Sequence, residues 1–166
     1  WGTHVGTVCP LVHCPEEMLE ELMRLARVQA GVDTLIDIGC GDGRVVLAAG
    51  RAGAKGLGLD INPGLIRAAN TRAKSEGLDS IVSFEECDLQ QLHVTHPHLE
   101  NVTVIYMYLL PEVLEMMTEL LQQMLARGVR IVTLDHHLKE NEFPKSGEAL
   151  FGALRLYESS TIQTNP

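Results

Sequence analysis

The sequence predicts an α/β fold: a doubly wound, mostly parallel sheet with helices on both faces, in three αβα layers. Short aliphatic and β-branched runs alternate along the chain with longer amphipathic segments, and this alternation is typical of parallel sheets. Glycine, proline or asparagine stands at most junctions between these segments, where such residues begin or end elements. A glycine-rich turn at 39–43 follows the first short run.

The first half of the chain predicts three helices and three strands. Pro15 and the acids after it favour a helix start, because proline fits the first turn and acids suit the positive end of the helix dipole. Asn62 is a preferred helix N-cap, and Gly31 and Gly77 end their helices. We expect helices over about 15–29, 44–52 and 62–76, and strands at 34–38, 55–60 and 81–85.

The second half predicts fewer elements. A strand at 102–106 has high β propensity, Pro111 opens a helix to about 126, and a fifth strand covers 129–134. After Asp135 the pattern weakens, so we expect a loop or short helix at 136–148 and one antiparallel strand near an edge at 154–162. This architecture usually has a further strand, which the pattern does not reveal.

The segment Asp37-Ile38-Gly39-Cys40-Gly41-Asp42-Gly43-Arg44 carries the clearest chemical signal. Glycines let a backbone turn sharply and approach a ligand, and the helix that follows directs free N–H groups toward it. The spacing is G-x-G-x-G, whereas a dinucleotide fingerprint is G-x-G-x-x-G. Asp60 ends the next strand, 21 residues after Gly39, where a ribose-binding carboxylate is expected. The alternatives are a tight turn without a ligand and a loop-capping role for Asp60.

These motifs resemble those of the Rossmann-like, class I S-adenosylmethionine-dependent methyltransferases. Asp60 matches the ribose-binding acid of that family, and Cys87-Asp88-Leu89 matches its third motif, where the acid meets the adenine amino group and the next residue packs on the ring. The resemblance runs from about 32 to 135 and implies S-adenosyl-L-methionine as cofactor, with S-adenosylhomocysteine as product. It implies these cofactor-binding residues: Asp37, Gly39, Cys40, Gly41, Gly43, Asp60, Ile61, Asp88, Leu89 and Tyr106.

A narrower resemblance concerns the segment 104–111, which ends in Tyr106-Met107-Tyr108-Leu109-Leu110-Pro111. It is similar to the group related to ATP synthase c-subunit lysine N-methyltransferase, as is the helix start at Pro15. The residues before Pro15 depart from the Val-Pro-Thr-Pro-like segment of that group. The resemblance implies methyl transfer to a protein lysine; a small-molecule methyltransferase and a non-catalytic nucleotide-binding module are the alternatives.

Two tyrosines are the candidate catalytic residues. Tyr106 and Tyr108 stand at the carboxyl end of the fourth strand, where such folds place ligands, and residues two apart on a strand face the same way. We expect Tyr108 to line the acceptor channel and Tyr106 to lie near the cofactor; core or rim aromatics are the alternative. For Asp135, His136 and His137 a solvated loop is favoured over a substrate-binding role.

Charge and cysteines limit the partners. The net charge of -9 disfavours nucleic acid and is compatible with a basic methyl acceptor. Cys9 and Cys14 lack zinc spacing, and the histidines at 93, 96 and 98 flank Pro97 in a polar stretch, so we expect no metal site. Reduced thiols favour an intracellular, by default cytoplasmic, protein. Since the chain does not begin with methionine, a preceding targeting segment is compatible with it.

We therefore expect one domain over 1–166. Its parts are an N-terminal segment and helix at 1–31, a cofactor-binding core at 32–135, and a C-terminal loop and edge strand at 136–166. No apolar run approaches the roughly 20 residues of a membrane helix.

Overall fold

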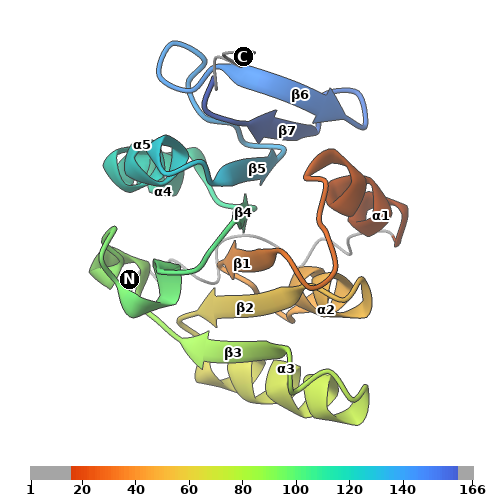
Figure 1. The fold of residues 1–166 in the computed structure, drawn as a ribbon. Coiled ribbons are helices and arrows are strands. Elements are labelled where there is room, and N and C mark those ends of the chain that lie inside the picture. The colour runs from red at the N-terminus through yellow and green to blue at the C-terminus, as the bar shows by residue number, and fades with distance from the viewer. Residues whose placement is uncertain (1–15, 161–166) are drawn as a thin grey trace.

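A computed structural model describes residues 16–160. Within that range one seven-stranded sheet has the order β3-β2-β1-β4-β5-β7-β6, and helices cover both of its faces (Figure 1). The strands are β1 (Thr34–Ile38), β2 (Lys55–Asp60), β3 (Val82–Glu86), β4 (Val104–Met107), β5 (Arg130–Leu134), β6 (Lys145–Ala149) and β7 (Leu154–Tyr157). The helices are α1 (Glu16–Leu25), α2 (Arg44–Arg51), α3 (Pro63–Ser75), α4 (Pro111–Met116) and α5 (Thr118–Ala126), with short 3-10 turns at Leu89–Gln91 and Pro97–Leu99. The predicted doubly wound α/β fold is confirmed.

The five strands β1 to β5 pair in parallel. Their order changes direction at β1, which lies between β2 and β4. In open sheets of this kind, the carboxyl ends of the strands at such a switch point form the ligand crevice. The ends of β1, β2 and β4 are therefore the place to look for a site.

Two apolar clusters lie on the two faces of the sheet. One joins α1, α2 and α3 to the sheet, through residues such as Leu22, Leu47 and Ile66. The other joins α4 and α5 to the opposite face, through residues such as Leu114 and Leu121. Asn62 caps α3 by accepting hydrogen bonds from the backbone N–H groups of Gly64 and Leu65, as its position in the sequence predicts.

Two predicted helices differ from the observed ones. The first is regular only to Leu25, because Arg27 adopts a left-handed conformation with φ 51°. The helix expected over 111–126 is interrupted at Met117, which separates α4 from α5. The hydroxyl of Thr118 donates to the carbonyl of Leu114 at 3.5 Å, a local bond that competes with regular helix geometry.

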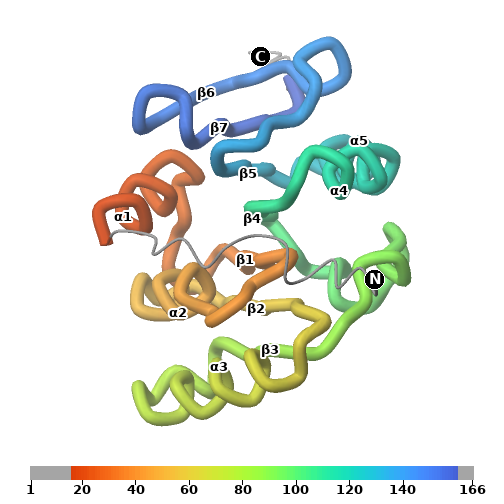
Figure 2. The backbone as a smooth tube through the Cα atoms, turned by 180° about the vertical axis from the view of Figure 1, so that it is seen from behind, coloured from red at the N-terminus to blue at the C-terminus, as the bar shows by residue number. Residues whose placement is uncertain are grey.

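The C-terminal region corrects the sequence-based expectation. Residues 145–148, expected in a loop or short helix, belong to the edge strand β6, and β7 lies inside it as an antiparallel neighbour of β5. Figure 2 shows this hairpin at the end of the sheet remote from β3. The strand Lys-Ser-Gly-Glu-Ala has low β propensity and a register irregularity, so its pairing with β7 rather than its own composition makes it a strand.

Some expectations fall on residues outside the described range. Cys9, Cys14, Pro15 and the segment before the first helix belong to 1–15, and the end of the last expected strand belongs to 161–166. Among the residues that the structure does describe, no helix has the length and apolar character needed to cross a membrane.

Candidate active site

The glycine-rich turn joins the carboxyl end of β1 to α2. Gly39, Gly41 and Gly43 have φ angles of 82°, 54° and 80°, a region that favours glycine. The backbone N–H groups of Gly39 and Cys40 both donate to the carbonyl of Leu59, each at 2.8 Å. At Gly43 an added Cβ would lie 2.5 Å from the Phe84 ring. The turn is therefore held tightly against β2 and β3, with α2 beginning directly behind it.

Asp60 ties this turn to the next helix. Its two carboxylate oxygens accept hydrogen bonds from the backbone N–H groups of Gly41 and Asn62, both at 2.9 Å, and the residue is 1% exposed. The loop-capping role considered from the sequence is thus observed. Each carboxylate oxygen has a further acceptor position, so capping and binding of a hydroxyl pair are compatible.

Asp37 lies at the same edge, and its surroundings raise the pKa of its carboxyl. It is 3% exposed, and burial, then the charges of Asp60 and Asp42, raise its pKa well above the ordinary value of 3.8. Among residues 16–160 the structure contains no hydrogen bond to its side chain. A buried carboxylate without a partner favours a cationic group beside it, because a positive charge offsets the cost of its ionisation. The pair Asp37 and Asp60 therefore fits a ligand that carries both a cation and hydroxyl groups.

The end of β3 extends the same edge. The backbone N–H of Cys87 donates to the carbonyl of Asp60 at 3.0 Å, which places the predicted third motif directly beside the ribose-binding candidate. Asp88 is half-buried and accepts a hydrogen bond from the N–H of Gln90 at 3.0 Å, while Leu89 is buried. The half-buried Ile61 follows Asp60, so these predicted cofactor contacts lie on adjoining segments.

The two described cysteines at this edge have a structural role. Cys40 and Cys87 are buried and form no disulfide. Burial raises the pKa of both thiols, and the neighbouring Asp37 raises that of Cys40 further. The thiols therefore stay protonated at neutral pH and do not act as nucleophiles.

The two tyrosines differ in accessibility. Tyr106 is paired in register with Asp37 and is buried inside β4. Tyr108 follows the strand, is half-buried and stacks on His136 with ring centroids 6.3 Å apart. Both pack against the cluster beneath α1, α2 and α3, so the expectation that they face the same side is confirmed. Only Tyr108 has the exposure that an acceptor-channel residue needs.

The segment after β5 is a loop, as expected, but only Asp135 of its first three residues is exposed. The Nδ1 atom of His137 lies 2.9 Å from the hydroxyl of the buried Thr133, and burial, with Arg155, lowers the pKa of His137. Asp135 is exposed and adopts φ 56°, with its N–H donating to Ala153 at 2.8 Å. The sequence did not predict these two contacts, which join the segment to Thr133 in β5 and to Ala153 in the turn before β7.

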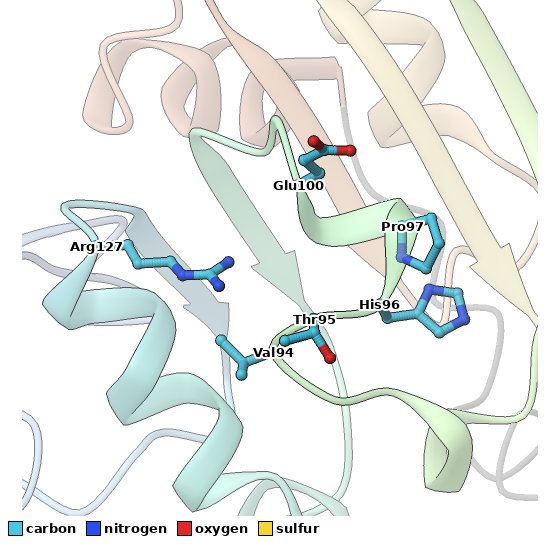
Figure 3. A pocket seen from close by; sticks show the side chains of 6 residues that line it. All are labelled: Val94, Thr95, His96, Pro97, Glu100 and Arg127. Carbon is cyan, nitrogen blue, oxygen red and sulfur yellow. The ribbon is translucent and has the colours of Figure 1, made fainter.

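Two cavities lie at opposite edges of the sheet. The larger, of about 470 Å³, lies between the turn after α5 and the loop before β4, and Figure 3 shows Arg127 facing residues 94–100 across it. Because these segments precede the amino ends of β4 and β5, this cavity is away from the glycine turn. A cavity of about 210 Å³ lies between α4 and the segment after β5, at the carboxyl edge.

Of the histidines at 93, 96 and 98, His96 lines the larger cavity. His98 contacts Glu85 at 3.2 Å, and the His96 ring accepts a hydrogen bond from the His98 N–H. Within residues 16–160, no group of three or more histidine, cysteine, aspartate or glutamate side chains is arranged to hold a metal ion.

Comparison with known proteins gives consistent results. Residues 37–144 match the family described as the ANTKMT methyltransferase domain. The chain is 33% identical over 125 residues to adenine nucleotide translocase lysine N-methyltransferase of Mus musculus, an alignment that covers 75% of this chain and 52% of that protein. It is 28% identical over 132 residues to a protein-lysine N-methyltransferase of Saccharolobus islandicus, covering 78% of each.

One solved structure is similar along most of its length. An RNA methyltransferase from Salinibacter ruber, crystallised with S-adenosyl-L-homocysteine, superposes with a TM-score of 0.72 at 30% identity and covers 86% of this chain and 89% of that one. The present chain spans about half the length of the mouse relative.

Proposed function

The chain belongs to the ANTKMT methyltransferase domain family, and from that premise we propose that it transfers a methyl group from S-adenosylmethionine to a lysine side chain of a protein. The fold is the Rossmann-like fold of S-adenosylmethionine-dependent methyltransferases. Two proteins similar in sequence to this chain are named as lysine N-methyltransferases.

The observation that carries the proposal is the pair of buried carboxylates at the switch point of the sheet. S-adenosylmethionine has a cationic amino acid part and a ribose diol. Asp37, buried and without a hydrogen-bond partner in the described chain, would hold the ammonium group, and Asp60 would accept the ribose hydroxyls. Gly39 and Gly41 would let the backbone approach the methionine part, and Asp88 with Leu89 would border the adenine.

The bound cofactor would supply an activated methyl group, so this chain's residues have to position and deprotonate the acceptor. A free lysine with a pKa of roughly 10.4 is less than about one part in a thousand neutral at pH 7. Removal of the amine from water lowers that pKa. Tyr108, stacked on His136 at the carboxyl edge, would line the path by which the amine leaves water.

The acceptor class separates this proposal from its alternatives. The similar structure from Salinibacter ruber is named as an RNA methyltransferase, which makes RNA the second candidate. The net charge of -9 opposes RNA, because nucleic-acid affinity rests largely on neutralising phosphates with basic residues. The same charge favours a basic protein segment.

The experiment has a binding stage and a transfer stage. Thermal unfolding is measured with S-adenosylmethionine, S-adenosylhomocysteine and NAD, and a ligand specific to the folded state raises the midpoint. The protein is then incubated with methyl-tritiated cofactor and separate protein and RNA fractions. We expect a shift with the first two ligands alone and label recovered as methyl-lysine. A shift with NAD alone would overturn the cofactor assignment, and label confined to RNA would overturn the lysine assignment.

A further inference from the structure

The cavity at the carboxyl edge is a groove with an apolar floor. It lies between α4 and the segment after β5, has a volume of about 210 Å³, and is lined by residues within 111–118 and 137–143. Its floor consists of Leu114, Leu138 and Phe143, which are all at most 5% exposed. Such a floor suits the methylene stem of a long side chain.

The rim of the groove is acidic and holds an ammonium group. The Nζ atom of Lys139 lies 2.7 Å from a carboxylate oxygen of Glu115. This contact lowers the pKa of Glu115 and raises that of Lys139, to which Glu142 contributes as well. The side chains of Glu115 and Lys139 are 67% and 59% exposed, so solvent and other cations have access to the pair. A carboxylate rim over an apolar floor is complementary to a lysine or arginine side chain.

The groove adjoins the candidate acceptor path. Pro111 follows Tyr108 by three residues, and His137 follows His136, while Tyr108 and His136 stack on each other. The carboxyl ends of β4 and β5 bring these segments to one edge of the sheet. A peptide whose lysine passes Tyr108 can therefore extend a neighbouring side chain over α4.

We propose that this groove binds a basic residue of the acceptor protein next to the lysine that is methylated. Glu115 takes the cation of that residue in place of Lys139, Glu142 adds to the negative rim, and Leu114, Leu138 and Phe143 contact its methylenes. The inference rests on the proposed function, because it takes the acceptor to be a protein. Charge complementarity between this acidic rim and a basic segment selects this occupant.

The test uses peptide binding, which needs no methyl transfer. The probe is a fluorescent peptide with one lysine flanked by two arginines, compared with a copy that has norleucine in place of both arginines. Fluorescence anisotropy is measured at low ionic strength with S-adenosylhomocysteine present. We expect Glu115→Gln to weaken binding of the arginine peptide by about two- to fivefold, the range of an exposed ion pair. Lys139→Met should strengthen it by a similar factor, because the competing ammonium is lost.

A matched control separates the groove from overall charge. Glu76→Gln removes one negative charge from a residue that pairs with Arg51 at the end of α2, which lies at the amino edge of the sheet. Its effect on peptide affinity should be negligible. The inference would be overturned if the parent protein bound the arginine peptide and the norleucine peptide equally well. Equal affinities of the parent, Glu115→Gln and Lys139→Met for the arginine peptide would also overturn it.

The two proposals fail in different ways. If the arginine peptide responds to both groove variants but no methyl-lysine forms with any protein fraction, the groove stands and the lysine methyltransferase activity fails. If methyl-lysine forms and neither peptide affinity nor the KM for the protein acceptor changes in Glu115→Gln, the activity stands and the groove fails. Thermal unfolding with S-adenosylhomocysteine confirms that each variant is folded.

Discussion

Replacement of Asp37 by asparagine tests the electrostatic basis of the site. In the folded protein, burial and the charges of Asp60 and Asp42 raise the pKa of Asp37 well above 3.8. A carboxyl with a raised folded pKa costs stability once the pH exceeds its unfolded pKa, because the unfolded chain then releases a proton that the native protein retains. Asparagine has a similar shape and cannot ionise. We therefore expect Asp37→Asn to be more stable than the parent protein.

The size of the effect follows from proton linkage. Between pH 3.8 and the folded pKa of Asp37, each pH unit lowers the parent's free energy of unfolding by about 1.4 kcal/mol relative to the variant. The difference between the two proteins should therefore widen as the pH rises above 3.8. It should stop growing once the pH passes the folded pKa.

The assay is urea unfolding of both proteins at several pH values from 3.8 upward to neutral pH. All other titrating groups are common to the two proteins, so the difference between their free energies of unfolding isolates Asp37. Calorimetry with S-adenosylhomocysteine should show an affinity lower by about ten- to a hundredfold in the variant, since an ion-paired hydrogen bond contributes about 1.5–3 kcal/mol. A stability difference that does not change over this pH range would refute the electrostatic reasoning, and unchanged affinity would refute the binding role.

Asp42→Asn is the control of opposite sign. The Arg44 guanidinium donates hydrogen bonds to this carboxylate and holds its pKa below the ordinary value. A group with a lowered folded pKa contributes stability above its unfolded pKa and loses it as the pH falls through the folded pKa. Asp42→Asn should therefore be less stable than the parent at pH 7 and approach it near pH 3.

Three further variants and one control test the turn, the ribose acid and the acceptor path. Gly43→Ala should lower the free energy of unfolding by about 2–4 kcal/mol, because the new Cβ would lie 2.5 Å from Phe84. The control is Gly77→Ala, at a position with φ +69° and no atom within 4 Å of an added Cβ. It should lower the free energy of unfolding by only about 1 kcal/mol in the same urea titration. Asp60→Ala leaves two backbone N–H groups without an acceptor and should weaken S-adenosylhomocysteine binding at least about tenfold in calorimetry. Tyr108→Ala should slow methyl transfer about tenfold while the same calorimetric affinity stays constant; a changed affinity would move Tyr108 into the cofactor site.

The edge of the sheet that holds the glycine-rich turn and Asp60 was largely predictable from the sequence. The turn at 39–43 and Asp60 are separated by one helix and one strand, and parallel connections return each strand to the same edge. Glycine spacing and the positions of acids therefore predicted that Asp60 would lie beside the turn, and its bond to the N–H of Gly41 agrees. The roles of these residues in cofactor binding remain predictions.

The strand β6 and the groove beside α4 were not predictable in the same way. The strand β6 has a polar sequence that forms a strand only because β7 offers it a hydrogen-bonding edge. The groove is built from α4 and from residues 137–143, which come from separate segments on either side of α5 and β5. No periodicity in either segment indicates that Lys139 meets Glu115.

The sequence by itself determined the layered α/β fold and the positions of the acids near strand ends, because these follow from local periodicity and from parallel connections that bring those ends to one edge. Only the tertiary structure decided which carboxylates are bonded and which are not. Asp60 accepts hydrogen bonds from two backbone N–H groups, whereas Asp37 is buried without such a partner in the described chain. That difference depends on burial and on the orientation of peptide groups from other segments, which the linear order of residues does not contain.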